Sequence, residues 1–560
     1  MCISFIASRR SGRSSAPTAR AGLSLLLLLL LALTACSASS STAPTPSPTS
    51  TLTPTQLCAQ AYKQPNPVVA ENQCTGSDSW RLDHALGASG AIEGFAAPAT
   101  VNAGQPVQLS VSTTAATFSY SVYRMGYYQG HGARLMYASD QLAGVVQPAA
   151  TVDATTRMVS AVNWSVSSVI HTDVTWVSGV YIVKLLSSDR YMRYAIFVVR
   201  NDASAAPIVV QMPFFTYQAY NRWGDHSLYR GLAPDGAYTF DYRSYAVSFD
   251  RPYDLNAGLG DFSMYDVELI NWLEQQSYNV TYMTDADLDQ ATTPLAQRKL
   301  VIVSGHSEYW STQMRHDITA ARDTGTSLAF FGGNDVYWHI RLLNSALGTD
   351  RVVVCYKSAT LDPVAQSDPL ATTVRWEDPP LHDPEVGLLG LEYGGGVAAT
   401  TPGEIASGSL PFLPNTALQV GSSIAGVIGG EYDRQAKTGS PPTLQLILSS
   451  PLQCKPTSQC PASGMDTANA SVYQTPSGAK VFDAGTFQWS WGLSDLRIDP
   501  LGSSTSGDSA APESAQAGAI TRHAGTGSND ETLLAAQAPA LYANSHFQQL
   551  TANILAYLMA

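Results

Sequence analysis

The chain has 560 residues, of which 45% are apolar and only 13% charged, and its formal net charge is −13. This length suggests two to four domains of ordinary size. The acidic balance argues against nucleic acid as a partner, because phosphate contacts need clustered Lys and Arg side chains.

The first segment reads as a targeting signal followed by a tether. Four arginines (Arg9, Arg10, Arg13, Arg20) precede an apolar run, Leu23–Leu33, that is short for a membrane span. The run ends in Leu33-Thr34-Ala35-Cys36, which resembles a bacterial lipobox. We therefore expect a signal peptide over 1–36, lipidation of Cys36 and an exported, membrane-anchored protein. An ordinary signal peptide is the alternative. Residues 37–56, rich in Ser, Thr and Pro, are expected to form a disordered tether.

The remaining cysteines fit an exported protein. Cys58 and Cys74 could form one disulfide, and Cys454 and Cys460 another. Cys355 lies in an apolar run, where a buried small side chain is the simplest interpretation. Neither Cys-x-x-Cys nor His-Glu-x-x-His occurs, so the usual zinc sites have no support.

Residues 57–202 are expected to form an all-β domain. Short alternating runs separated by Gly, Pro, Asn and Asp are typical of a β-sandwich; they lie at 106–111, 118–123, 179–184 and 194–199. A hinge at 201–207 then leads to the next domain.

Residues 206–560 change to an alternation of strands and helices. Strands are expected at 208–214, 279–283, 299–304 and 328–331, and helices at 264–276 and 311–324. This alternation predicts a parallel sheet in a flavodoxin-like or amidotransferase-like α/β domain. A mobile loop is expected at 503–530, and a closing helix carries Leu550, Ile554 and Leu558 at a spacing of four.

Three strand ends carry polar side chains. Tyr220 follows the first strand, His306 and Glu308 follow the third, and Asn334 follows the fourth. Parallel strands would place these side chains at one edge of the sheet. Oxygen ligands of this kind suit a hard metal ion. The alternative is a wall of aromatic loops without chemistry. Gly305–Tyr309 also begins like a nucleophile elbow with Ser307, but Tyr309 replaces the last glycine.

Six motifs, in the same order, resemble the C-terminal region of the large (beta) subunit of N,N-dimethylformamidase. They are Tyr123–Arg134, Trp176–Tyr181, Thr216–Gly224, Ser248–Tyr253, Gly305–Trp310 and Phe331–Asn334. The resemblance runs from about Phe118 to about Ser358, and more loosely to the C-terminus.

The resemblance implies an amidohydrolase that cleaves the C–N bond of a small linear amide with water activated by a mononuclear Fe(III). The family's metal is held by two tyrosines and one glutamate. Glu308 matches the glutamate, Tyr220 one tyrosine (with Tyr217 as competitor) and Tyr181 the other. The family's catalytic residues match His306, Asn334, Lys357 and Glu431. Fe(III) suits phenolate and carboxylate ligands, and it can polarise a carbonyl and acidify water.

The leader and tether depart from a soluble amidase. A non-catalytic surface protein that binds glycan or peptide on the same scaffold is therefore the alternative function. A small amide substrate and the membrane are the expected partners, and a homo-oligomer is left open.

Overall fold

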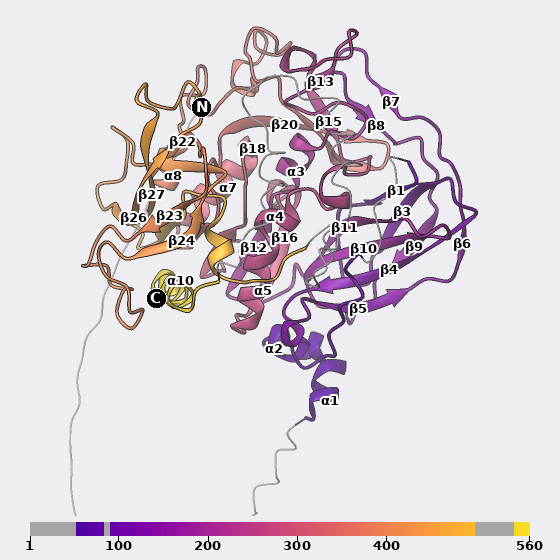
Figure 1. Cartoon of the computed structure of the whole chain (residues 1–560), viewed down its shortest axis with the longest axis horizontal. Helices are drawn as coiled ribbons and strands as arrows, with labels where there is room; N and C mark the ends of the chain where they lie inside the picture. Colours follow the sequence, from indigo (N-terminus) through magenta and orange to yellow (C-terminus); the bar gives the residue numbers. More distant parts are fainter. Residues whose placement is uncertain (1–51, 83–89, 499–542) are drawn as a thin grey trace, which may run out of the picture. The chain divides into compact units, whose positions relative to one another are not determined.

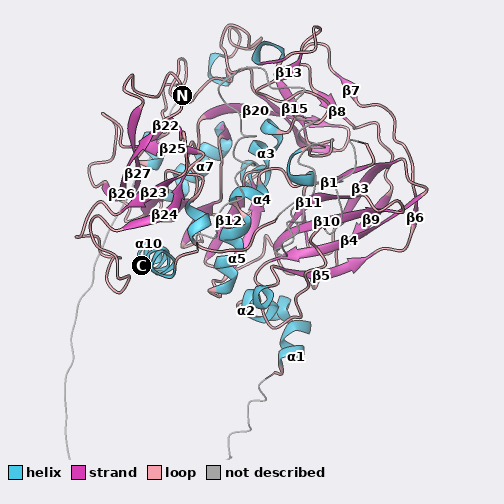
Figure 2. Cartoon of the chain, in the orientation of Figure 1, coloured by secondary structure: helices cyan, strands magenta, loops and turns pink. Residues whose placement is uncertain are grey.

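The computed structural model describes residues 52–82, 90–498 and 543–560. The predicted lipidation at Cys36, the signal peptide, most of the tether and the loop at 503–530 lie outside these residues. The described residues belong to one compact unit, Leu52–Ala560. The molecule is mostly β with some helices (Figure 2).

The alternating runs after Ile92 form two facing sheets (Figure 1). One contains β1 (Ile92–Ala97), β3 (Pro106–Thr113) and β9 (Ser168–His171). The other has the order β2 (Thr100–Asn102), β11 (Met192–Arg200), β10 (Gly179–Ser187), β4 (Thr117–Met125) and β5 (Ala133–Ala138), with β6 (Leu142–Ala143) beside β4. Their inward side chains, such as Leu109, Val183 and Phe197, share one buried cluster, as alternation in a two-sheet domain predicts.

The second large sheet has the order β16 (Val280–Thr284), β12 (Ile208–Met212), β17 (Leu300–Val303), β19 (Ser327–Phe330), β28 (Lys480–Asp483), β27 (Met465–Gln474) and β26 (Gln445–Gln453). The first five strands are parallel; four of them were predicted, and β28 was not. β27 and β26 are antiparallel, so the sheet is mixed rather than wholly parallel. In chain order the parallel strands run 2-1-3-4-5, an order found in flavodoxin-like sheets. Assignment of the whole region to that fold stays a prediction.

Helices of this part cover the sheet and follow its strands. They are α3 (Phe214–Tyr220), α4 (Phe262–Tyr265), α5 (Val267–Gln275), α6 (Asp285–Asp289), α7 (Thr312–Asp323), α8 (Val386–Leu389) and α10 (Ser545–Met559). Ser311 caps α7 by accepting a hydrogen bond from the Met314 amide, and Gly325 follows the helix at φ +109°. α10 buries Leu550, Ile554 and Leu558. The predicted helix at 264–276 is instead two helices that meet at Asp266.

Short elements border the carboxyl edge of the parallel strands. A four-stranded sheet has the order β15 (Ala246–Ser248), β21 (Gly348–Val354), β20 (Trp338–Ser345) and β18 (Tyr309–Ser311). Two-stranded pairs are β7 (Thr151–Val152) with β8 (Val159–Ser160), β13 (Gly231–Leu232) with β14 (Tyr238–Thr239), β22 (Glu392–Gly396) with β25 (Glu431–Arg434), and β23 (Thr401–Glu404) with β24 (Ser423–Ile428).

The remaining helical elements are short. Before the sandwich lie α1 (Pro54–Ala59), η1 (Ala61–Lys63) and α2 (Pro67–Glu71); later 3₁₀ turns are η2 (Tyr128–Gly130), η3 (Phe240–Tyr242), η4 (Leu255–Gly258), η5 (Pro369–Ala371) and η6 (Trp489–Gly492). Within the described ranges, none of the helices has the length and apolar character to cross a membrane.

The cysteine predictions are confirmed. Disulfides join Cys58 to Cys74 and Cys454 to Cys460. Cys355 is a buried free cysteine.

Candidate functional site

The carboxyl ends of β12, β17 and β19 meet at one place. After β12 the chain turns directly into α3, whose last residue is Tyr220, where the sequence suggested a loop. The segment after β17 is tied to α3, because the Glu308 amide donates to Thr216 Oγ1 at 3.0 Å. A Cβ on Gly332 would lie 1.8 Å from the Gly305 carbonyl oxygen, so the segments after β17 and β19 approach as closely as glycine allows.

Three oxygen atoms form a tight triangle at this edge. The Tyr220 hydroxyl lies 2.9 Å from the Tyr229 hydroxyl and 2.8 Å from Glu308 Oε2. The Tyr229 hydroxyl lies 2.8 Å from the same Oε2 and 2.6 Å from Oε1. Burial, followed by the Glu308 charge, raises the pKa of Tyr229 well above its usual value, so this phenol donates to the carboxylate.

Asn334 connects Glu308 to a second carboxylate. Its Nδ2 donates to Glu308 Oε1 at 3.2 Å and to Glu431 Oε2 at 2.7 Å. Asn334 has φ +54°, a region that Asn tolerates better than most residues, and its amide nitrogen donates to Asp433 Oδ1 at 2.9 Å. The Tyr393 hydroxyl donates to Glu431 Oε1 at 2.8 Å. The amide side chain of Asn334 is therefore fixed between the two glutamates.

His306 lies beside both glutamates without a directed hydrogen bond to either. Its Nε2 is 3.5 Å from Glu308 Oε2 and 3.8 Å from Glu431 Oε2. Its ring centroid lies 4.1 Å from that of Phe487. Neither ring nitrogen has a hydrogen-bond partner among the described residues. Burial lowers the pKa of His306 to about 3, so the imidazole is neutral and can accept a proton only weakly.

Lys357 adds a positive charge to the site. Its Nζ donates to the Tyr309 hydroxyl at 2.7 Å and lies 3.3 Å from the centroid of the Tyr229 ring. Burial lowers the pKa of Lys357 to about 8. Burial, followed by the Glu308 charge, raises the pKa of Glu431 to about 7. These two groups are thus poised near neutral pH, which is the range that proton transfer requires.

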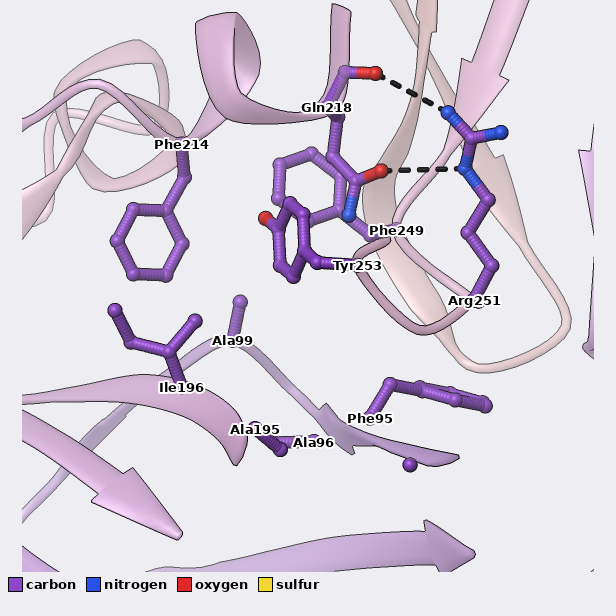
Figure 3. Close-up of a pocket in the computed structure, with 11 residues that line it drawn as sticks. Phe95, Ala96, Ala99, Ala195, Ile196, Phe214, Gln218, Phe249, Arg251 and Tyr253 are labelled. Atoms are coloured by element: carbon purple, nitrogen blue, oxygen red, sulfur yellow. Dashed lines mark hydrogen bonds between the residues drawn. The ribbon is translucent and has the colours of Figure 1, made fainter. Parts of the chain in front are cut away.

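A buried arginine holds the segment that joins the two tyrosines. Arg251 donates to the carbonyl oxygens of Gln218, Asn221, Trp223 and His226 at 2.9–3.1 Å. Its Nε also donates to Gln218 Oε1 at 3.3 Å. Figure 3 shows two of these bonds, beside a small cavity lined by Phe95 and Ile196 of the sandwich. The sandwich therefore packs against the residue that supports the tyrosine loop.

The structure does not bring Tyr181 to this site, so its assignment as a ligand is corrected. Tyr181 lies on β10 in the core between the two sandwich sheets. Its ring stacks on Trp176 and Phe197, and its hydroxyl donates to the Val177 carbonyl oxygen at 2.7 Å. Tyr217, the competitor of Tyr220, donates instead to Asp266 Oδ2 at 2.5 Å. Alternation along β10 directs the Tyr181 side chain into the sandwich core. On α3, the Tyr217 side chain points toward Asp266 rather than toward Glu308.

Two site residues were missed by sequence reasoning. Tyr229 occupies the position expected for Tyr181, and Tyr393 orients Glu431. Tyr229 lies nine residues beyond Tyr220 in an irregular segment, so a search for polar residues directly after predicted strands does not find it. The rings of Tyr220 and Tyr229 stack with centroids 4.5 Å apart, a contact that the sequence does not reveal.

Ser307 is not arranged as a nucleophile. Its backbone amide donates to Asp335 Oδ1 at 2.6 Å, and its hydroxyl accepts from Trp310 Nε1 at 3.1 Å. The side chain is 1% exposed. No hydrogen bond joins Ser307 to His306 within the described ranges.

A cavity of about 740 Å³ opens in front of the triangle. Glu308, Asn334, Lys357 and Glu431 line it, together with several aromatic residues and the loops that carry Phe240 and Gln459. In the part of the chain that the structure describes, His, Cys, Asp and Glu side chains do not gather in threes as a metal site. The oxygen triangle is a different kind of candidate metal site, because two of its three oxygens are phenolic.

The fold and the site together define a protein with a β-sandwich packed on a mixed α/β sheet and a phenol–carboxylate site at the sheet's carboxyl edge. The chain belongs to the family described as N,N-dimethylformamidase beta subunit-like, C-terminal, whose model matches residues 119–504.

Other comparisons are weak. No curated protein matches this sequence. A Paenibacillus sp. cycloisomaltooligosaccharide glucanotransferase complexed with cycloisomaltoheptaose aligns at 8% identity and a TM-score of 0.14, over 44% of this chain and 28% of that one. Murine CEACAM1b aligns at 16% identity and a TM-score of 0.11, over 22% of this chain and 62% of that one. At these scores neither structure informs fold or function.

Proposed function

We propose that this protein is an amidohydrolase that cleaves the C–N bond of a linear amide, with Tyr220, Tyr229 and Glu308 holding one ferric ion. The triangle of three oxygens, with sides of 2.8–2.9 Å, is the observation that carries the proposal. Phenolate and carboxylate are hard anionic ligands, which is the donor set that Fe(III) prefers. When bound, such an ion supplies a Lewis acid that polarises a carbonyl and lowers the pKa of water.

The protein's own residues fit the proton transfers of hydrolysis. Glu431 is only partly exposed, at 23%, and faces the cavity with a pKa of about 7. It can accept a proton from an attacking water as the new C–O bond forms. The same carboxyl can return that proton to the amide nitrogen as the C–N bond breaks, releasing an amine and a carboxylic acid.

One donor is placed for the negative charge that develops on the carbonyl oxygen. Lys357 lines the cavity, and its ammonium group has hydrogens beyond the one that it donates to Tyr309. Asn334 already donates both side-chain hydrogens to Glu308 and Glu431, so it positions the two carboxylates. A fixed donor such as Lys357 stabilises a tetrahedral intermediate, because it is oriented before the reaction begins. His306 lies beside the two glutamates, with Nε2 at 3.5 Å from Glu308 Oε2 and 3.8 Å from Glu431 Oε2.

The test is to express the protein with ample iron and to measure bound metal together with the hydrolysis of dimethylformamide and larger amides. We expect about one iron per chain, with amine and acid formed in equal amounts. Glu431→Gln should retain iron and lose most of the rate. Iron-free protein that binds amides or glycans without turnover would instead favour the binding-protein alternative.

The location of the protein is a separate proposal. The lipobox-like sequence at Leu33–Cys36 supports lipidation of Cys36 and an extracytoplasmic, membrane-anchored protein. We expect Cys36→Ser to move the protein from the membrane fraction to the soluble fraction. Equal membrane recovery of both forms would contradict the anchor.

A further inference from the structure

The cavity is much larger than a dimethylformamide molecule. Its volume is about 740 Å³. Pockets of roughly 300–1,000 Å³ hold ligands of drug size. The proposed reacting groups (Glu308, Asn334, Lys357 and Glu431) are four of its sixteen lining residues, so most of the wall is available to the rest of the substrate.

Aromatic side chains form much of the cavity wall. Phe240 on η3, Tyr238 on β14, Tyr337, Trp338 and Tyr393 all line the cavity. Tyr337 packs edge-on against both Trp338 and Tyr393, with centroids 5.2 and 5.0 Å apart. Phe240 is 50% exposed, and the guanidinium of Arg243 lies 3.9 Å from the centroid of its ring.

A loop closed by a disulfide forms another part of the cavity wall. Thr457, Ser458 and Gln459 line the cavity and lie between the disulfide-bonded Cys454 and Cys460. Gln459 Nε2 donates to the Tyr337 hydroxyl at 3.3 Å, which ties this loop to the aromatic wall. Ring contacts, a disulfide and a hydrogen bond therefore hold these two parts of the cavity wall in place.

We infer that the substrate is an amide with an aromatic ring substituent, whose ring packs against Phe240 and the Tyr337–Tyr393 wall. This inference rests on the proposed function and specifies its substrate class. Against such walls an aromatic ring buries apolar surface and makes edge-on or stacked contacts with other rings. Dimethylformamide, which carries only two methyl groups, lacks a ring to make these contacts.

The experiment compares kcat/KM of the iron-loaded protein for dimethylformamide, N-methylformanilide and N,N-dimethylbenzamide. The two aryl amides carry the ring on the nitrogen and on the carbonyl, respectively. We expect at least one aryl amide to exceed dimethylformamide by tenfold or more. Phe240→Ala should lower the ratio of aryl amide to dimethylformamide by about tenfold. Tyr137→Ala, which removes a ring of similar exposure on β5, is the control and should leave the ratio unchanged.

The outcomes separate this inference from the proposed function. Hydrolysis of dimethylformamide with no preference for aryl amides overturns the inference and leaves the amidohydrolase intact. A preference for a sugar-bearing amide, such as N-acetylglucosamine, overturns the aromatic assignment. Iron-loaded protein that hydrolyses none of these amides contradicts both.

Discussion

Asn334 is the residue on which the geometry of the two glutamates depends. It donates to both carboxylates and stands at a backbone conformation that suits Asn. Asn334→Asp keeps the size and the backbone preference, but it replaces a shared donor with a third negative charge. We expect kcat/KM to fall by about 10²-fold or more, as for loss of a fixed donor. A fall of less than threefold in protein with normal iron content would show that Asn334 does not position the site.

Replacement of Ser307, in contrast, should leave amide hydrolysis almost unchanged. Its hydroxyl accepts from Trp310 and has no hydrogen bond to His306 in the described part of the chain. Ser307→Ala should keep amide hydrolysis within about threefold, because only one buried hydrogen bond, worth about 1 kcal/mol of stability, is lost. Complete loss of activity in folded, iron-loaded protein would restore the serine-hydrolase interpretation.

At the scale of elements, Arg251 supports the loop between the two tyrosines. Lysine keeps the charge but has three donors on one atom and cannot span four carbonyl groups. Arg251→Lys should therefore loosen the segment 221–229, weaken the phenolate-to-iron absorption per bound iron and lower stability by about 3 kcal/mol.

The matched control is Arg351→Lys, which disturbs a buried arginine that pairs with Asp250 instead. Both variants are expected to unfold more easily, and only Arg251→Lys should alter the absorption per iron. Identical spectra in the two variants would reduce Arg251 to a general stabilising role.

The sequence predicted elements better than it predicted side-chain partners. Apolar runs located β12, β17 and β19, the last two followed by Ser or Gly, and therefore brought Tyr220, Glu308 and Asn334 to one edge. Tyr181 was misassigned because its motif matched while its strand position faces the sandwich core. Tyr229 and Tyr393 lie on irregular or short elements, whose positions depend on tertiary contacts such as those of Arg251. Periodicity carries no information about such contacts.

At the scale of the whole molecule, buried carboxyl groups make stability depend on pH. Burial raises the pKa of Glu385 from 4.5 to about 7, where its carboxyl accepts from the Tyr393 amide. Between these values the folded state holds a proton that the unfolded state releases. Stability therefore falls as pH rises from about 4.5 to about 7, by at most about 1.4 kcal/mol per pH unit.

Glu385→Gln should remove this contribution, because the amide cannot ionise and its oxygen still accepts a hydrogen bond. Urea unfolding at pH 4.5, 6 and 8 should show the variant gaining stability relative to the natural sequence as pH rises. Burial also raises the pKa values of Asp266 and Glu268. Both proteins contain these residues, so their contributions to the pH dependence of stability cancel in the difference. A difference independent of pH would contradict the assignment.

The measurement that tests the central claim most directly is the iron content and visible absorption of Tyr229→Phe beside Tyr181→Phe. Each substitution removes one buried phenolic hydroxyl, from the oxygen triangle in one case and from the sandwich core in the other. We predict that Tyr229→Phe loses the phenolate-to-iron absorption and most of the bound iron, and that Tyr181→Phe keeps both. Retention of iron and colour in Tyr229→Phe, or their loss in Tyr181→Phe, would contradict the account.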